Sequence, residues 1–345
     1  MGSANVKILA GDIGGTKTIL QVAECVNGSI QPLFEQRYES QKFDTFERLL
    51  IQFYTEFKID QKEIESACVG VAGPVTQVGS RFTSKVTNLP WKLDSDELSQ
   101  QFCNGLFSLI NDFQAIGYGV ELLNDDDLVI LQNGKADYKA TKAVIGAGTG
   151  LGQAYLVWNE LHDNYKVMPS EAGHSSFAPT TRRERQLLDY LAAKKEFVSL
   201  EQVVSGPGIT NIYHFLSQEK DATPGEILLS ASNSVDMTPT IVRQALNGQN
   251  SLAVEALDIF LNAYGAAAGN LALTVAATGG VYVAGGIASK IVDKMQSGQF
   301  VSAFNAKSKM KSWLESFPVY LVTNEKIGLL GAANFGLKSY LAEGS

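Results

Sequence analysis

Two glycine-rich stretches, GDIGGTKT (residues 11–18) and GAGTGLG (146–152), decide how this sequence of 345 residues folds. An apolar segment precedes each of them, residues 6–13 in the first half and 142–145 in the second, and predicts a buried β-strand. A further strand-like segment follows each stretch, so both are predicted to be turns between strands. The arrangement occurs only twice, which indicates two similar lobes instead of a solenoid.

The first half reads as strands interrupted by helices. Its predicted strands are residues 6–13, 18–26, 31–38, 66–72 and 106–110. Asn27-Gly28 is a hairpin signal between the second and third of them. Apolar residues at helical spacing predict a helix over residues 43–57, and a second helix is predicted from Asp112 through Leu123.

The second half repeats the pattern with one addition. Its predicted strands are residues 142–145, 153–158 and 165–168, and VYVAGGIA (281–288) mirrors VGVAGPV (69–75). The helical stretch over residues 183–261 has no counterpart and is interpreted as an insertion that enlarges the second lobe. A final helix over 329–341 is predicted to return to the first lobe.

Strands alternating with helices make each lobe α/β. The predicted small α/β domain comprises residues 1–112 and 325–345, and the predicted large α+β domain comprises residues 113–324.

Composition and charge exclude several classes of function. The formal net charge is −8 and no basic cluster stands out, which argues against a nucleic-acid or anionic-membrane partner. Hydrophobic residues make up 45%, yet no apolar run approaches the roughly 20 residues that span a bilayer, and no secretion signal is recognised. We therefore expect a cytoplasmic protein. The widely spaced Cys25, Cys68 and Cys103 are expected to be buried, reduced thiols.

The first glycine turn has the chemistry of a phosphate site. Glycines allow successive N–H groups to point at one oxygen, Thr16 adds a hydroxyl donor, and Asp12 is a candidate Mg²⁺ ligand. A plain hairpin turn, in which Gly14 and Gly15 only satisfy φ angles, is the alternative.

The second half has two further glycine turns. Gly148 and Thr149 repeat the phosphate chemistry, so a cleft with one such turn on each wall would clamp a triphosphate. Gly285-Gly286 is apolar and suits an adenine and ribose. GxxxxGK[ST] is absent, and GAGTGLG precedes a strand where a dinucleotide fingerprint needs a helix.

Polar residues next to predicted strands suggest the acceptor side of a phosphoryl transfer. Asp112 is a candidate base and Asn111 a candidate hydroxyl ligand, although Asp112 is equally well placed as a helix N-cap. Glu171 and His174 of PSEAGHSSFAP (169–179) are suited to vicinal hydroxyls. Zinc at His174 is disfavoured because no ligand has the required spacing. Glu201 is a further carboxylate that, taken alone, reads as solvated helix surface.

With these residues in view, the chain resembles the bacterial-type glucokinases of the hexokinase and actin-like superfamily. The motifs come in the family's order and nearly span the chain: GDIGGTKT (11–18), VAGPV (71–75), TNLPW (87–91), NDF (111–113), GAGTGLG (146–152), EAGH (171–174), EQVVSGPG (201–208), VYVAGGI (281–287) and GLLGAA (328–333).

The resemblance implies a two-lobed ribonuclease H-like (actin-like ATPase/hexokinase) fold that transfers a phosphoryl group from ATP, with Mg²⁺, to the 6-hydroxyl of glucose. The implied ATP ligands are Gly11, Asp12, Ile13, Gly14, Gly15, Thr16, Gly148, Thr149, Gly285 and Gly286. The implied glucose ligands are Asn111, Asp112, Glu171, His174 and Glu201, with Asp112 as the general base.

The resemblance also implies a homodimer and a role in glycolysis. The related repressor–kinase group follows its EAGH-type segment with a cysteine-rich zinc motif, whereas this sequence continues SSFAP (175–179), so no structural metal is expected. Lys17 is assigned no role.

Three rival functions remain on the sequence alone. A kinase for another hexose or N-acetylhexosamine would use the same polar residues. A sugar-responsive regulator of this fold would need a DNA-binding module, for which a first strand beginning near Val6 leaves no room. An ATP hydrolase of this fold would have no use for the sugar-like set that includes Asn111, Glu171 and His174.

Overall fold

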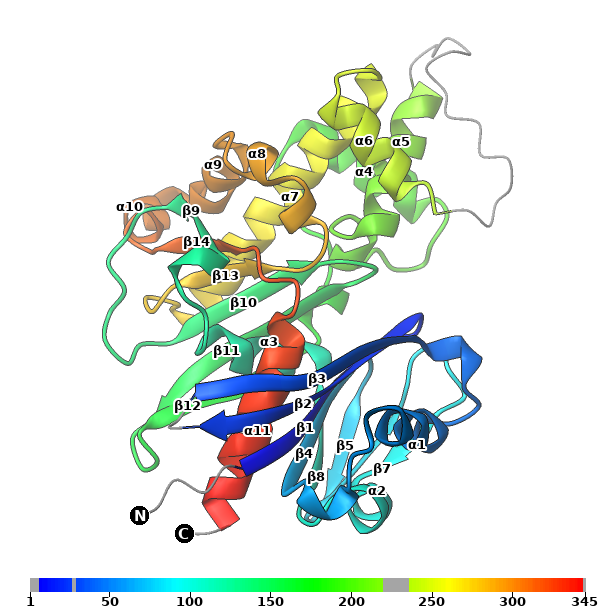
Figure 1. Ribbon diagram of the computed structural model, residues 1–345. Helices are drawn as coiled ribbons and strands as arrows, with labels where there is room; N and C mark the ends of the chain where they lie inside the picture. The colour runs from blue at the N-terminus through cyan, green and yellow to red at the C-terminus, as the bar shows by residue number, and fades with distance from the viewer. Residues whose placement is uncertain (1–5, 27–28, 220–235, 344–345) are drawn as a thin grey trace. The chain divides into compact units, whose positions relative to one another are not determined.

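The computed structural model describes residues 6–26, 29–219 and 236–343 (Figure 1). The chain divides into two compact units, residues 1–124 with 326–345 (unit 1) and residues 125–325 (unit 2). The first boundary falls later than the predicted one after Asp112, because the helix that begins at Asp112 packs against the C-terminal helix of unit 1.

Unit 1 is built on a five-stranded sheet in the order β3-β2-β1-β4-β8. Its strands are β1 (Val6–Ile13), β2 (Lys17–Val26), β3 (Ser29–Glu39), β4 (Ser66–Val71) and β8 (Phe107–Asn111). β1, β2 and β3 form antiparallel pairs, whereas β4 and β8 run parallel to β1. The predicted hairpin pairing of β2 with β3 is confirmed, while Asn27-Gly28 itself lies outside the described residues.

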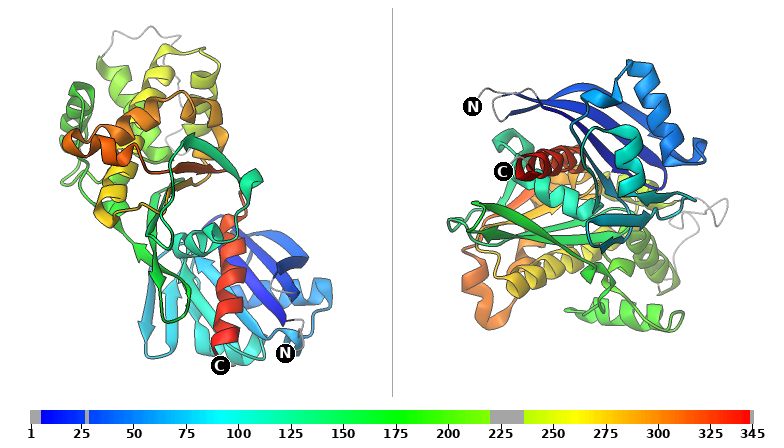
Figure 2. Two further views of the ribbon diagram at one scale, coloured as in Figure 1. Left: turned by 90° about the vertical axis from the view of Figure 1, so that its left-hand side faces the viewer. Right: turned by 90° about the horizontal axis from the view of Figure 1, so that it is seen from below.

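Helices cover both faces of this sheet. Along β1, Leu9 and Ile13 belong to one core cluster with Phe46, Leu49 and Phe53 of α1 (Phe46–Phe57). Ile8, on the other face, packs against Leu337 and Tyr340 of α11 (Ile327–Glu343). Figure 2 shows this helix beside the sheet from a second direction. This two-sided burial follows from the period of two in a strand. The prediction that the final helix returns to the first lobe is confirmed.

The remaining elements of unit 1 lie around this core. They are α2 (Ser95–Phe102), α3 (Asp112–Val120) and a three-stranded sheet of β5 (Val75–Val78), β6 (Arg81–Lys85) and β7 (Lys92–Asp94). Neither α2 nor the small sheet was predicted from the sequence. The predicted end of α3 at Leu123 was wrong, since the helix ends at Val120.

Unit 2 repeats the same topology. Its sheet has the order β12-β11-β10-β13-β14-β9. The strands are β9 (Leu128–Gln132), β10 (Lys142–Ala147), β11 (Leu151–Asn159), β12 (Asn164–Ser170), β13 (Val281–Ala284) and β14 (Val319–Val322). The antiparallel pairs β10/β11 and β11/β12 and the parallel pairs β10/β13 and β13/β14 match those of unit 1 in order and direction. The predicted duplication is therefore confirmed, and β9 is an added edge strand that the sequence analysis missed.

The predicted helical insertion lies between β12 and β13, where unit 1 has the single α-helix α1. It comprises α4 (Arg182–Ala192), α5 (Gly206–Glu219), α6 (Thr238–Leu246) and α7 (Ser251–Val275), and residues 220–235 of the predicted stretch lie outside the described part of the chain. After β13 come α8 (Val292–Met295), α9 (Gln299–Asn305) and α10 (Lys311–Leu314).

Small residues let α7 pack closely against α9. A Cβ atom at Gly265 would lie 2.2 Å from the Phe300 carbonyl oxygen of α9, and one at Gly269 would lie 2.4 Å from that of Phe304. Either side chain would therefore push the two helices apart.

The cysteines are free, but they are not all buried. Cys25 and Cys68 are buried, whereas Cys103 is half-buried at the end of α2, where the expectation of a buried thiol was wrong. Burial raises the pKa of the Cys68 thiol well above its ordinary value, which keeps it protonated. Among the described helices, none is long and apolar enough to cross a membrane.

Candidate active site

The carboxyl ends of β1, β4 and β8 meet at one edge of the unit 1 sheet. In the parallel register, Ile13 pairs with Val71, which in turn pairs with Asn111. The predicted phosphate turn, the VAGPV segment and the start of α3 therefore leave the sheet side by side. Asn111 Nδ2 donates to the Gly73 carbonyl oxygen at 3.4 Å and links two of these segments directly.

The first glycine turn is a hairpin, but Gly14 and Gly15 are not required there to adopt positive φ angles. Neither Gly14 nor Gly15 has a positive φ. A Cβ at Gly15 would lie 2.9 Å from the Thr87 carbonyl oxygen, so a side chain there would displace the TNLPW segment. The N–H of Gly14 donates to the Lys17 carbonyl oxygen at 2.9 Å, whereas those of Gly15 and Thr16 find no acceptor among the described residues. These two N–H groups are therefore available to an anion.

Two other predicted ATP ligands have packing roles that the sequence analysis did not assign. A Cβ at Gly11 would lie 2.6 Å from Val69 Cγ1 on the neighbouring strand, so glycine is needed there for sheet packing. Ile13 is fully buried in the unit 1 core.

Asp12 is half-buried near the end of β1. Burial raises the pKa of its carboxyl, and the positive charge of Lys17 partly offsets that rise. A Cβ at Gly328, in the first turn of α11, would lie 3.9 Å from Asp12 Oδ2, so this helix N-terminus is next to the carboxylate. Asp12 is therefore the residue of this turn that would hold a divalent cation, and such an ion would supply positive charge next to the available N–H groups.

Asn111, and not Asp112, is the N-cap of α3. The Asn111 Oδ1 atom accepts the N–H groups of Phe113 at 2.9 Å and Gln114 at 3.3 Å. The alternative in which Asp112 serves as the cap is therefore wrong. Asp112 is the first residue of the helix and is half-buried.

In unit 2, Glu201 lies against the second glycine turn. Its Oε2 atom accepts the N–H of Leu151 at 2.9 Å, at the point where the turn enters β11. A Cβ at Gly150 would lie 2.5 Å from the same oxygen, so only glycine fits beside this carboxylate. The interpretation of Glu201 as solvated surface is wrong, because the residue is half-buried and hydrogen-bonded.

The loop that carries Glu171 and His174 joins the same region of unit 2. The two side chains are 71% and 65% exposed, and Glu171 Oε2 lies 4.0 Å from His174 Nε2. The Leu200 N–H donates to the Ser175 carbonyl oxygen at 2.8 Å, which ties this loop to the segment of Glu201. A Cβ at Gly173 would lie 2.0 Å from the Leu151 carbonyl oxygen, so the loop also packs on the glycine turn. The structure thus brings together Glu171, His174 and Glu201, each of which retains polar atoms for hydroxyl groups.

The same turn forms one end of a cavity of about 850 Å³. Gly148, Thr149 and Gly286 line it, as the predicted ATP site required. Gly285 lies just behind: its φ is 91°, and a Cβ there would lie 2.6 Å from the Ala147 carbonyl oxygen. Three of the four residues predicted to bind the nucleotide in the second lobe therefore line one cavity. The fourth, Gly285, lets its backbone approach Ala147 closely.

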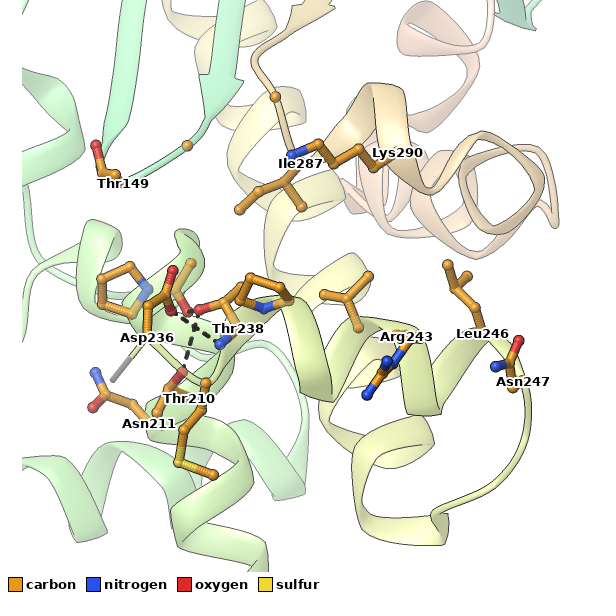
Figure 3. Close-up of a pocket in the computed structure, with 17 residues that line it drawn as sticks. Thr149, Thr210, Asn211, Asp236, Thr238, Arg243, Leu246, Asn247, Ile287 and Lys290 are labelled. Atoms are coloured by element: carbon orange, nitrogen blue, oxygen red, sulfur yellow. Dashed lines mark hydrogen bonds between the residues drawn. The ribbon is translucent and has the colours of Figure 1, made fainter. Parts of the chain in front are cut away.

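Sequence reasoning missed most of this cavity. Figure 3 shows Ile287 and Lys290 on one wall and Thr238, Arg243 and Leu246 on the opposite one. Thr238 Oγ1 donates to the Gly206 carbonyl oxygen at 2.8 Å, and the Gly206 N–H donates to that of Gly148 at 2.8 Å. The glycines of SGPGI (205–209) were the available signal, since they permit α6 and α5 to approach the turn.

Comparison with known proteins shows the family of this chain. The Glucokinase family model matches residues 9–339. A glucokinase from Nostoc sp. is 43% identical over 94% of this chain and 97% of its own length. One from Synechocystis sp. is 41% identical over 96% of this chain and 98% of its own.

The chain belongs to the glucokinase family.

The crystal structure of a glucokinase from an Antarctic psychrotroph superposes with a TM-score of 0.81 at 30% identity, covering 96% of this chain and 99% of that one. The fold of this glucokinase-family chain is accordingly the duplicated actin-like ATPase fold. The two glycine turns occupy equivalent places in the repeat, one between β1 and β2 and the other between β10 and β11.

Proposed function

We propose that this chain transfers the γ-phosphoryl group of ATP to the 6-hydroxyl of glucose, with Asp112 as the general base. The observation that carries the reaction is family membership over residues 9–339, because glucokinases are kinases that phosphorylate glucose. The assignment of individual residues rests on the geometry within each unit.

ATP is the phosphoryl donor. We assign its adenosine to the cavity beside Gly286 and Ile287, and its phosphates to the N–H groups of Gly15 and Thr16 and to the turn at Gly148-Thr149. Asp12 is the residue that would hold Mg²⁺, directly or through water. When bound, this ion would neutralise charge on the phosphate oxygens.

Asp112 would act on the acceptor hydroxyl. Its carboxylate accepts the proton of the sugar 6-hydroxyl as the sugar oxygen forms its bond to the γ-phosphorus atom. The bond from that phosphorus to the bridging oxygen breaks at the same time, and ADP leaves with the bonding electron pair. Its place at the first position of α3 is compatible with this role, because Asn111 is the N-cap, although Asp112 Oδ1 also accepts the Phe113 N–H at 2.9 Å.

The other sugar hydroxyls would be held by Asn111 of unit 1 and by Glu171, His174 and Glu201 of unit 2. Carboxylate, imidazole and amide groups can hydrogen-bond to both the donor hydrogen and the acceptor oxygen of a hydroxyl group, and so fix its orientation. Asn111 has two cap bonds on its Oδ1 atom and donates one Nδ2 hydrogen to Gly73, so we expect it to offer its other Nδ2 hydrogen to the sugar. Glu201 would bind a hydroxyl with the oxygen that does not face Leu151.

The wider setting follows from the reaction. A glucose kinase feeds glycolysis, and we propose a cytoplasmic homodimer as the working form. Equilibrium sedimentation would test the dimer directly, and a single monomeric species at micromolar concentration would contradict it.

A sugar panel tests the proposed acceptor. ADP release should be measured in a coupled assay with glucose, mannose, N-acetylglucosamine, N-acetylmannosamine and no sugar. We expect the largest kcat/KM with glucose and very little ADP without sugar. A larger kcat/KM with another hexose would assign a different kinase, and sugar-independent release at the same rate would indicate an ATP hydrolase.

A further inference from the structure

A second cavity, of about 180 Å³, lies in unit 2 apart from the nucleotide cavity, with which it shares no lining residue. Its walls are strands β11 and β12, the loop that follows β12, and the alanine-rich face of α7. Its volume equals roughly six water molecules at about 30 Å³ each, which is the size of one small ligand.

One buried polar side chain in this cavity has no partner. Gln153 is only 4% exposed and lines the cavity from β11. Among the described residues, nothing hydrogen-bonds to its carboxamide. Its side-chain nitrogen and oxygen are not among the unpaired atoms that are shut off from solvent, so the carboxamide opens onto the cavity. It therefore offers one donor group and one acceptor to a molecule in the cavity.

A second amide faces the same space. Asn270 of α7 lines the cavity, and its Oδ1 atom accepts a hydrogen bond from Lys307 Nζ at 2.7 Å. This bond fixes the orientation of the amide and leaves its Nδ2 hydrogens as donors. Ser175 and Thr274 add hydroxyl groups to the lining, although each already donates to a backbone carbonyl oxygen.

The lining also limits the charge of a ligand. None of the residues that line this cavity is charged, and Tyr155, Phe177 and Leu271 add apolar surface. A neutral molecule with several hydroxyl groups and an apolar carbon frame matches these walls, which are open to solvent at Ser175, Asn270 and Thr274 and offer an ion no counter-charge.

We propose that this cavity is a binding site for a neutral polyol of cyclitol or monosaccharide size, distinct from the sugar site of the catalytic reaction. Its position gives binding a route to that site. Ser170 and Ala172, which flank Glu171, line the cavity, and so does Leu200, which precedes Glu201. An occupant would thus restrict the loops that carry the proposed glucose ligands, and only this consequence rests on the proposed function.

Saturation-transfer NMR with myo-inositol tests the site in the absence of ATP, so the result does not depend on phosphoryl transfer. The wild-type chain should bind the probe at millimolar concentration. Gln153→Leu, which keeps the size of the side chain and removes the amide, should weaken binding roughly tenfold. Ala267→Leu, which fills the cavity from α7, should abolish it and serves as an independent variant if Gln153→Leu folds poorly.

Two control variants locate the binding. Gln296→Leu makes the same change at an exposed position of unit 2 outside the cavity, and His174→Ala alters the proposed sugar site. Both should bind myo-inositol like the wild type. The proposal is overturned if the wild-type chain shows no transfer, since the cavity then holds water alone. It is also overturned if His174→Ala loses binding while Gln153→Leu retains it.

Discussion

At the scale of single residues, the structure assigns different positions in helix α3 to the adjacent residues Asn111 and Asp112. Asn111 and Asp112 are adjacent and both suit a helix N-cap, so the sequence left the role of Asp112 open. The structure gives the cap to Asn111, whose Oδ1 atom accepts the Phe113 and Gln114 N–H groups. Asp112 is the first helical residue, and its Oδ1 atom also accepts the Phe113 N–H at 2.9 Å, so its role as the base stays a proposal.

Asp112→Asn should lower kcat by roughly 10²–10⁴-fold and leave glucose binding largely intact, because the amide keeps the shape but cannot accept the proton. The coupled ADP assay gives kcat, and calorimetry gives the glucose Kd. Asp293→Asn, an acidic first-turn residue of α8 that is exposed, is the matched control and should change neither. Retention of more than half of the wild-type turnover would remove Asp112 from the role of base.

Asp12→Asn should stabilise the fold while removing Mg²⁺-dependent activity. Burial raises the pKa of Asp12 above its ordinary value of 3.8, so keeping the carboxyl ionised at pH 7 costs folding free energy. The neutral amide should raise the free energy of unfolding at pH 7 by roughly 1–3 kcal/mol. The gain should shrink as the pH falls through the raised pKa toward 3.8, where the carboxyl is protonated in both folded and unfolded chains.

Urea unfolding at pH 7 and pH 4 measures this difference. A variant that is less stable than the wild type at pH 7 would show that the ionised carboxylate contributes to stability.

At the scale of elements, the second glycine turn connects the two halves of the proposed chemistry in unit 2. Gly148 lines the cavity proposed for the nucleotide, while Gly150 lies against Glu201. Both glycines belong to the same turn, but the space available for a side chain differs between the two positions. Nothing lies within 4 Å of a Cβ at Gly148, so that position has open space, whereas Gly150 has none.

Gly150→Ala and Gly148→Ala should therefore separate the two substrates. The methyl group at residue 150 would displace Glu201 and break its bond to the Leu151 N–H, so the KM for glucose should rise about tenfold. The methyl group at residue 148 enters the nucleotide cavity, so the KM for ATP should rise and that for glucose should not. Steady-state kinetics with each substrate varied in turn would decide. Equal effects on both constants from either variant would contradict this division of the turn.

At the scale of the whole molecule, the chain is a duplicated unit with unequal additions. Both sheets share strand order and direction, but unit 2 adds β9 and places α4 to α7 where unit 1 has the single α-helix α1. The proposed glucose ligands come from both copies, with Asn111 and Asp112 in unit 1 and Glu171, His174 and Glu201 in unit 2.

Glucose should therefore reduce the radius of gyration of the chain, since one sugar bound by both units restrains them together and excludes water from the γ-phosphoryl group. Small-angle scattering with and without saturating glucose measures the change, and galactose at the same concentration controls for solvent contrast. An unchanged radius with glucose would contradict closure on sugar binding.

The sequence by itself determined the repeated strand–turn–strand pattern, the helical insertion and the identity of the polar residues. Period-two and helical spacing are local properties, and glycine marks a turn wherever it follows a strand. Tertiary structure alone decided which neighbours each residue meets. The contact of Glu201 with a turn about fifty positions earlier, the nucleotide cavity roofed by α6, and the edge strand β9 all depend on segments distant in sequence. Such contacts arise from packing between elements, and no periodicity within one element encodes them.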